Sequence, residues 1–415
     1  MVNEELAKNS MPLNDVVNDL MIFNCVLQTA GDEFSLKRGG VAIPYVISQP
    51  GAGKTASFVD LCMRLGWGLI VVHLAMKPIE ELGGIPDFRD IEINGEKYPG
   101  TIWSIPDLIG QLYKMEAKNL PGIFLCFDDI HLCGSTYLGL MQEFFTERTM
   151  RGYKIPNSVA ICLFGNSTNK AGAKVLSSAI TNRCCLLPIV ADYESWRKNF
   201  ALGNLQETPK LGFNPEKLRE LAKKITRVHP AVTSFLGRDS YSKFWHEEEQ
   251  VDSPWASPRS WTRFSNWLFA YELVHGRIME DHYCLYLGTG HVGKEAASEF
   301  IKYYKIFSKF DIPHILNTVD TYTLPTSPVD QYALAYAVTS HYCNDNNRKA
   351  IVGDFAKFIL KYFDSLPDLA LMVVREILDT ENIVNKRTLY IDLTTELNSL
   401  RPGVTYNLLK DVNQA

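Results

Sequence analysis

The feature that most constrains this chain is the stretch Val46-Ile47-Ser48-Gln49-Pro50-Gly51-Ala52-Gly53-Lys54-Thr55, in which an apolar run meets a glycine-rich turn. The pattern predicts a strand, a tight loop and a helix that begins near Lys54. Gly51 and Gly53 allow backbone N–H groups to turn inward around an anion, and the helix N-terminus adds positive charge. The stretch therefore predicts a phosphate-binding loop.

The chemistry expected of this loop is that of a P-loop. Lys54 would reach the β- and γ-phosphates of a nucleotide, and Thr55 would bind Mg²⁺. The residues expected to surround the nucleotide are Gln49, Pro50, Gly51, Ala52, Gly53, Lys54, Thr55 and Ala56. Ser48 stands where the motif usually begins with Gly, and it fits there if its backbone is extended. The alternative, a chance Gly-Lys-Thr turn, does not account for the strand before it and the helix after it.

Length, composition and charge limit the classes of protein that this chain can belong to. At 415 residues it exceeds the size at which a single core stops growing, so we expect two or three domains. Hydrophobic residues make up 46% and charged residues 21%, which is typical of a globular protein with a large core. The net charge of −5 provides no overall attraction for nucleic acid or an anionic membrane.

The cysteines and the N-terminal residues bear on the compartment. The nine cysteines are scattered, and several lie in apolar runs, as Cys126 and Cys162 do, which is typical of reduced thiols. They show no metal-ligand spacing. No basic region followed by an apolar core begins the chain, and no apolar run approaches ~18 residues. We therefore expect a cytoplasmic protein without a signal peptide or a membrane span.

The hydrophobic pattern predicts an α/β fold followed by helices. A helix is expected over 13–30 and another over 54–65. Apolar runs predict five strands, at 41–47, 69–74, 123–127, 159–164 and 184–189. Strands that are apolar throughout indicate a parallel sheet covered on both faces.

The remainder of the chain is predicted to be helical. Candidate helices lie at 193–202, 215–227, 258–275, 294–308, 329–342, 349–364 and 367–379, whereas 386–415 shows no clear pattern. A Pro-containing turn at 324–328 separates the last three of these helices from the others. We therefore expect an α/β nucleotide-binding domain over 1–191, an all-helical domain over 192–310 and a helical C-terminal region over 311–415.

Two further motifs stand outside this series. The Asn94-Gly95 pair lies among alternating residues at 91–98, which predicts a β-hairpin that projects from the sheet. The segment from Gly288 to Lys294 repeats the spacing of the phosphate loop, but Glu295 replaces the Mg²⁺-binding hydroxyl. We interpret that segment as a turn between two helices.

Polar side chains follow two of the predicted strands. Asp128 and Asp129 follow the third strand, and Asn166 follows the fourth. Asp128 would hold Mg²⁺ through its water shell, Asp129 would orient an attacking water, and Asn166 would hold that water. A helix-capping Asp pair and an Asn in a turn are the alternatives. Their position at successive strand ends favours the catalytic role.

The order of these motifs resembles the AAA+ ATPases, specifically the MoxR-like branch of bacteria and phages. The resemblance covers about 20–310 and includes the phosphate loop, the Asp-Asp strand end, the Asn-ending strand and the segment Leu176-Ser-Ser-Ala-Ile-Thr-Asn-Arg183. Members carry a stretch like His73-Leu-Ala-Met-Lys-Pro-Ile-Glu-Glu-Leu-Gly-Gly-Ile-Pro86 after the second strand. They also carry a Ser-Pro-Arg, here Ser257-Pro258-Arg259, at the start of a lid helix.

This resemblance implies a fold and an assembly. It implies ATP and Mg²⁺ as ligands, a sheet with strand order 5-1-4-3-2, and a ring, usually a hexamer, with ATP at the subunit junctions. Arg259 would touch the γ-phosphate of its own subunit, and Arg183 would reach the neighbouring subunit's nucleotide. Taken alone, either arginine could instead form a surface salt bridge. Ser257 as N-cap and Pro258 as first helical residue would fix the first turn independently.

The resemblance also concerns partners. The hairpin around Asn94 resembles an insert of this branch that faces the pore or a substrate. Relatives often work with a partner that bears a von Willebrand factor A domain. The chain departs from the family where the usual Glu is Asp129, one methylene shorter, and where the usual Asn-Arg is His131-Leu132. We therefore expect slow hydrolysis.

The leading hypothesis is a ring-forming MoxR-like AAA+ ATPase that remodels or activates a protein partner. The rival is an assembly protein that binds ATP to form a ring and hardly hydrolyses it, and Asp129 is the residue that separates the two. A third hypothesis, a DNA-directed motor or loader, is disfavoured by the acidic net charge and by the lack of a recognisable DNA-binding element.

Overall fold

The computed structural model describes residues 10–30, 40–166, 176, 178–191, 193–197, 214–225, 227–238, 244–245, 254–344, 348–384 and 388–404. Contacts divide the chain into two units. One consists of Met1–Val228 with Ser242–Ser298, and the other of His229–Tyr241 with Glu299–Ala415. The division falls within helix α16 (Lys294–Ser308). The three-part domain division expected from the sequence stays a prediction.

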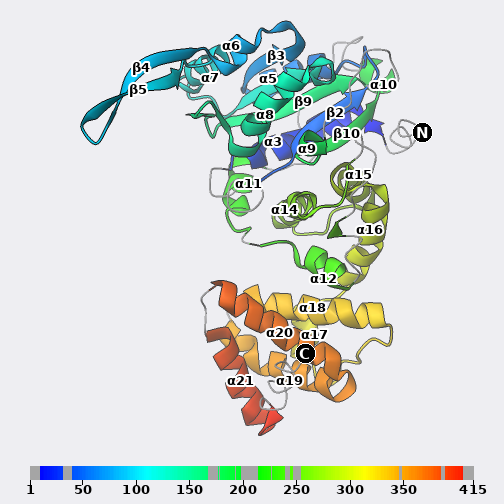
Figure 1. The fold of residues 1–415 in the computed structure, drawn as a ribbon. Coiled ribbons are helices and arrows are strands. Elements are labelled where there is room, and N and C mark those ends of the chain that lie inside the picture. The colour runs from blue at the N-terminus through cyan, green and yellow to red at the C-terminus, as the bar shows by residue number, and fades with distance from the viewer. Residues whose placement is uncertain are drawn as a thin grey trace. The chain divides into compact units, whose positions relative to one another are not determined.

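A parallel sheet forms the centre of the first unit (Figure 1). Its six strands follow the order β1-β10-β2-β9-β6-β3, and every neighbouring pair is parallel. The strands are β1 (Met11–Pro12), β10 (Cys184–Val190), β2 (Ile43–Ser48), β9 (Val159–Asn166), β6 (Ile123–Asp128) and β3 (Gly68–His73). The predicted α/β class is confirmed.

The strand order differs from the predicted one. The five longer strands follow one another as expected, but β1 adds a sixth strand at the edge beside β10. There Met11 pairs with Ile189, and Pro12 pairs with Val190. A strand of this length is too short to show a period in the sequence. Pro12 suits the edge because it has no backbone N–H to offer a further strand.

Helices cover both faces of the sheet. On one face, apolar residues of β6 and β3 pack in a common core with α7 (Asp107–Glu116) and α8 (Ser135–Glu147). On the other face lies α5 (Lys54–Leu65), whose Phe58 contacts Phe124 and Phe164 edge-on at centroid distances of 4.8 and 5.3 Å. Strands that are apolar throughout need both covers, because neither face can be left in water.

The predicted N-terminal helix is present but is not uniform. It comprises α2 (Leu13–Asp15), a π-helical segment (Val16–Met21) and α3 (Ile22–Gln28). At its end the buried side chain of Gln28 bonds the backbone of Ile161 in β9 twice, since Nε2 donates to the carbonyl and Oε1 accepts from the N–H, both at 2.8 Å. The helix is therefore attached to the sheet through a side-chain amide.

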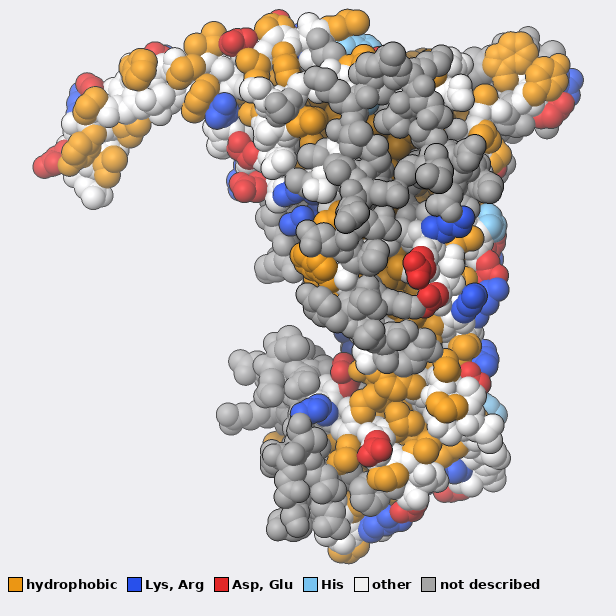
Figure 2. Space-filling model, turned by 45° about the vertical axis from the view of Figure 1, so that its right-hand side comes forward, with side chains coloured by type: hydrophobic (Ala, Val, Ile, Leu, Met, Phe, Trp, Pro, Cys, Tyr) orange, Lys and Arg blue, Asp and Glu red, His pale blue; other side chains and the backbone are white. Residues whose placement is uncertain are grey.

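The predicted hairpin is confirmed, and it is longer than the sequence indicated. Strands β4 (Pro86–Ile93) and β5 (Glu96–Trp103) pair along their whole length and extend away from the sheet (Figure 1). Asn94 and Gly95 both have positive φ, 55° and 86°, as a type I′ turn requires. Hydrophobic side chains are exposed along the hairpin (Figure 2), and Phe88 is 81% exposed.

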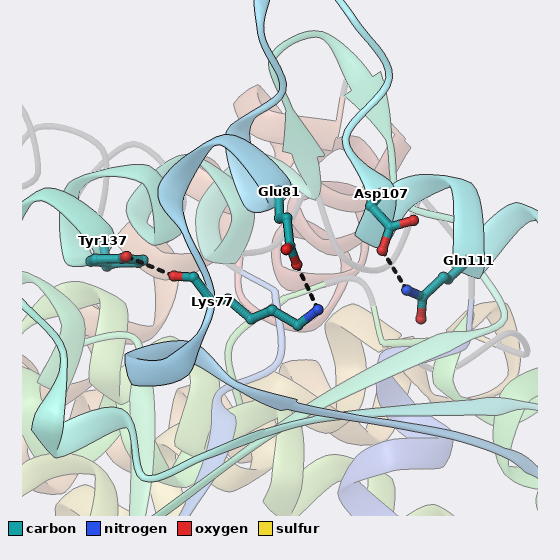
Figure 3. A network of polar contacts seen from close by, with 5 residues as sticks. All are labelled: Lys77, Glu81, Asp107, Gln111 and Tyr137. Atoms are coloured by element: carbon teal, nitrogen blue, oxygen red, sulfur yellow. Dashed lines mark hydrogen bonds and ion pairs between the residues drawn. The ribbon is translucent and has the colours of Figure 1, made fainter.

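The base of the hairpin is fixed by hydrogen bonds to the core. The segment before it contains a short 3₁₀ helix (Leu74–Met76) and α6 (Ile79–Gly83). Tyr137 of α8 donates to the carbonyl of Lys77 at 2.7 Å (Figure 3), and Tyr153 donates to the carbonyl of Trp103 at 2.7 Å. The Lys77–Glu81 pair in the same view is exposed and contributes little to stability.

The remaining helices of the first unit agree with the sequence prediction in part. α14 (Pro258–His275) has the predicted bounds, with Ser257 as its N-cap and Pro258 in its first turn. α15 (Asp281–Val292) was not among the predicted helices, and it includes residues 288–292, which were expected to lie in a turn. The junction between two helices is present, but it is confined to Gly293, whose φ is 87°, immediately before α16. α10 (Tyr193–Trp196) begins where predicted, and 198–202 of its predicted range lies outside the described residues. α11 (Pro215–Ala222) ends earlier than predicted.

All the regular secondary structure described in the second unit is helical. It contains α12 (Pro230–Arg238), α17 (Ile312–Asn317), α18 (Pro328–Asn344), α19 (Arg348–Ser365), α20 (Pro367–Val384) and α21 (Thr388–Leu400). Its core includes Leu334, Phe355, Ile359 and Ile377, all fully buried. α21 lies in the region 386–415, where no clear pattern was found in the sequence. Among the described helices, none combines the length and apolar character that a membrane crossing needs.

Candidate nucleotide-binding site

The predicted strand, loop and helix of the glycine-rich stretch are all present. Strand β2 ends at Ser48, and α5 begins at Lys54 with Gly53 as its N-cap. Gly51 and Gly53 both have φ of 83°, a left-handed conformation that side chains rarely adopt. A Cβ at Gly51 would meet no atom within 4 Å, so the backbone angle and not crowding requires glycine there.

The loop presents unused hydrogen-bond donors. Within the described residues, the backbone N–H groups of Gly51, Ala52 and Gly53 donate to no other group, and no side chain caps α5. The first N–H groups of a helix have no partner inside the helix and carry partial positive charge. Together they form a cradle that suits the phosphate groups of a nucleotide.

Lys54 is buried beneath this loop and is only 8% exposed. Its Nζ donates to Ser48 Oγ at 2.7 Å and to Asn166 Oδ1 at 3.0 Å. Burial lowers the pKa of Lys54, while the carboxylates of Asp128 and Asp129 oppose this shift. Ser48, which in sequence was only a departure from the motif, therefore holds the lysine. Its own hydroxyl donates to the Gln49 carbonyl at 2.8 Å.

The side-chain oxygens of Thr55 and Asp128 lie next to each other. Thr55 Oγ1 donates to Asp128 Oδ2 at 2.9 Å, and Asp128 Oδ1 accepts from the backbone N–H of Asp129 at 2.9 Å. A hydroxyl beside a carboxylate at the end of a strand is a donor set that Mg²⁺ prefers. The residues present thus fit the predicted ion.

Asp129 and Asn166 form the next contact along the sheet edge. Asn166 Nδ2 donates to Asp129 Oδ1 at 3.1 Å. The Asn166 amide thus has its oxygen toward Lys54 and its nitrogen toward Asp129. Asp129 has φ of 54° and ψ of 36°, in the left-handed region. Asp and Asn occupy this region more readily than longer residues, which accounts for an aspartate here.

Sequence reasoning missed the contribution of His131. This side chain is 4% exposed, and its Nδ1 accepts from the backbone N–H of Asn166 at 3.3 Å. Burial lowers the pKa of His131; Lys54 lowers it further, whereas Asp129 and Asp128 raise it. The only sequence signal was that His131 stands three positions after Asp128, where the resembling family has Asn.

The structure does not bring the two predicted arginines to the phosphate loop of this chain. The carbonyl of Arg183 accepts from the N–H of Ile43 at 3.1 Å, which puts Arg183 at the start of β2. The loop follows the other end of that strand, roughly 16 Å away at ~3.3 Å per residue. Arg183 Nε donates to Thr146 Oγ1 at 2.6 Å.

Arg259 lies on the same side as Arg183. It is exposed in the first turn of α14 and lines a cavity of about 190 Å³ together with Arg148 and Arg263. Arg263 donates to the carbonyl of Arg183 at 2.7 Å. Burial lowers the pKa of Arg263 to about 10, and the positive charges of Arg259 and Arg183 contribute to this shift. Arg148, Arg183, Arg259 and Arg263 thus lie near the amino-terminal ends of the central strands, whereas the phosphate loop follows the carboxyl end of β2.

Comparisons with known proteins find similarity in structure alone. No family model matches the sequence, and no curated protein matches it. A candidate ATPase from Cytophaga hutchinsonii is 13% identical, with a TM-score of 0.43 over 71% of this chain and 89% of that one. A full-length MCM homologue from Methanopyrus kandleri is 10% identical, with a TM-score of 0.31 over 68% of this chain and 54% of that one.

A third structure, NtrX from Brucella abortus, is 12% identical, with a TM-score of 0.24 over 89% of this chain and 66% of that one. Similarity at these levels does not indicate function.

Proposed function

We propose that this protein is an AAA+ ATPase of the MoxR-like type, which binds ATP with Mg²⁺ and couples its hydrolysis to the remodelling or activation of a protein partner. One observation carries the proposal. Side chains from the ends of three strands and the start of one helix meet in a single hydrogen-bonded network, which consists of Ser48, Lys54, Thr55, Asp128, Asp129 and Asn166.

The binding step follows from the loop. The unused N–H groups after Pro50 and the α5 N-terminus would hold the phosphates, and Lys54 would add a full charge beside them. Thr55 and Asp128 would hold Mg²⁺, which supplies positive charge against the phosphate oxygens. Binding would replace the contact between Lys54 and Asn166, since the same ammonium group would turn to the phosphates.

The hydrolytic step is assigned to Asp129 and Asn166. Phosphoryl transfer needs little covalent chemistry from the protein, so positioning of the attacking water dominates. The carboxylate of Asp129 would accept a proton from that water, and the Asn166 amide would hold it in place. Their hydrogen bond of 3.1 Å keeps both groups at the same edge of the sheet.

The arginines support the proposal of a ring. Arg183 lies about one strand length (~16 Å) from its own phosphate loop, and Arg259 lines a cavity with Ile43 at the same end of β2, so neither is placed to serve the nucleotide of its own chain. In a ring that stacks this edge on the next subunit's loop, both would approach the neighbour's phosphates. We therefore assign Arg259 to the neighbour's site with Arg183, in place of the role in its own subunit that the resemblance implies.

The hairpin is our candidate for contact with a protein partner. It exposes hydrophobic side chains along its length, and Phe88 and Ile93 are 81% and 53% exposed. Exposed apolar surface of this kind marks protein interaction sites. A partner with a von Willebrand factor A domain is the one that the family resemblance favours. We place the protein in the cytoplasm, where its nine cysteines, none of which is in a disulfide, would stay reduced.

The proposal is tested by Lys54→Ala. The substitution removes the charge from the phosphate cradle and should reduce ATP affinity by at least about a hundredfold, since charge-assisted contacts to phosphate are strong. Isothermal titration calorimetry with ATP and Mg²⁺ measures the effect, and circular dichroism checks the fold. Lys77→Ala, which removes an exposed lysine from an ion pair outside the loop, is the matched control. Equal ATP affinity of Lys54→Ala and parent would refute the P-loop assignment.

A second candidate function is favoured by Asp129. Its carboxylate is one methylene shorter than the glutamate usual at this position, which would slow the proton transfer. In that case the protein binds ATP to assemble and hardly hydrolyses it. Steady-state phosphate release, measured with and without the partner, separates the two functions.

A further inference from the structure

His131 occupies a place in the network that the proposed mechanism does not yet use. It lies in a 3₁₀ turn (Ile130–Leu132) after β6, and its side chain is buried at 4% exposure. The charged groups near the ring are Lys54 from α5, Asp128 from β6 and Asp129 from the turn itself. Its Nδ1 accepts a hydrogen bond from the backbone N–H of Asn166.

Strand β9 is paired further along β2 than along β6. On the β6 side, the ladder ends with Phe127 opposite Leu163, whereas on the β2 side it continues to Ser48 opposite Asn166. The backbone N–H of Asn166 therefore lies beyond the last paired residue of β6. The imidazole of His131 provides the acceptor that a longer β6 would have provided.

The bond also determines the tautomer of the His131 imidazole. An N–H···N bond at 3.3 Å requires that Nδ1 carry no proton, so a neutral imidazole has its proton on Nε2. With its backbone held by His131, Asn166 keeps its side-chain oxygen toward Lys54 and its nitrogen toward Asp129. The backbone bond and the two side-chain bonds thus constrain the same residue from different directions.

We propose that His131 is a positioning residue for hydrolysis, which holds Asn166 at the end of β9 so that its amide meets Asp129 and the attacking water. The inference rests on the proposed ATPase function. His131 would act through Asn166 and would not touch the nucleotide. Its loss should therefore lower kcat and leave KM and ATP affinity nearly unchanged.

The test compares two substitutions of similar size. His131→Leu fills the volume but removes the acceptor, whereas His131→Asn places a carbonyl oxygen close to the former Nδ1 and keeps it. His291→Leu is the control for loss of a buried histidine, because His291 is 2% exposed on α15 and its Nδ1 bonds the Leu287 carbonyl of its own helix.

The first readout needs no nucleotide. Amide hydrogen exchange at Asn166, measured by NMR on the free protein, should accelerate at least about tenfold in His131→Leu and stay near the parent value in His131→Asn and His291→Leu. The second readout is steady-state ATP hydrolysis. A shift on the order of 1 Å can cost roughly a hundredfold in rate, so kcat should fall about ten- to a hundredfold in His131→Leu alone.

The outcomes separate the inference from the proposed function. Unchanged exchange at Asn166 in His131→Leu, or faster exchange with unchanged kcat, would overturn the positioning role. A parent that binds ATP without releasing phosphate would refute the proposed hydrolysis, and the exchange comparison would then decide by itself whether His131 holds Asn166.

Discussion

At the scale of single residues, backbone conformation selects the side chains of the site. Asp129 is held in the left-handed region with φ of 54°, where Asp and Asn are favoured over longer residues. Gly51 and Gly53 are required for the same reason in the loop. The shortened carboxylate, which looked like a weakened catalytic group in the sequence, is therefore the acidic side chain best suited to this backbone.

Asp129→Asn removes the carboxylate without requiring a different backbone conformation. Asn adopts the left-handed conformation as readily as Asp, and its Oδ1 can still accept from Asn166, so fold and ATP binding should persist. Turnover should fall by about 10²- to 10⁴-fold, the usual contribution of a positioned general base. Phosphate release in single-turnover experiments measures it, and calorimetry verifies ATP affinity. An Asn variant as fast as an active parent would mean that another group orients the water.

At the scale of elements, α3 completes the hydrogen bonding of β9. Register between β2 and β9 begins only at Tyr45 opposite Leu163, so Ile161 has no partner residue in β2. Gln28 supplies both the missing donor and the missing acceptor at 2.8 Å. The helix thus takes the place of a strand at this point and stabilises the strand that carries Asn166.

Gln28→Leu should therefore be more destabilising than the loss of one exposed bond. It leaves the N–H and the carbonyl of Ile161 without partners in a buried place, which should lower the free energy of unfolding by about 2–4 kcal/mol. Urea unfolding followed by tryptophan fluorescence measures the change. Gln111→Leu, on the exposed face of α7 (Figure 3), removes only a surface bond to Asp107 and should change stability by less than about 0.5 kcal/mol. Similar losses in both variants would contradict the proposed role of Gln28.

At the scale of the whole molecule, we expect a second chain to complete the proposed site. The phosphate loop lies at the carboxyl end of β2, and Arg183 lies at the other end of the same strand. An arginine supplied by a second subunit stabilises charge in the transition state of phosphoryl transfer. A ring is the closed assembly in which every subunit can both give and receive such a residue.

Arg183→Ala should preserve ATP binding and lower turnover by roughly 10³-fold or more. Mixing this variant with Lys54→Ala should restore activity, because a junction between the two kinds of subunit can contain an intact loop and an intact arginine. Phosphate release from mixtures over a range of ratios measures the recovery. Arg401→Ala, which removes an exposed arginine of the second unit paired with Asp364, should change nothing. Absence of recovery while fluorescently labelled subunits exchange would refute the shared site.

The sequence by itself determined the local structure of this protein, because each local element depends on neighbours in the chain. Adjacent residues were enough to predict the loop glycines, the Asn94-Gly95 turn and the Ser257 cap. Apolar runs were enough to predict five of the six strands of the central sheet. Only the tertiary structure decided the rest. Lys54 and Asn166 bond across 112 positions, and the bond of His131 to Asn166 exists because β6 ends before β9 does. Such contacts depend on strand register and helix packing, which no local period encodes.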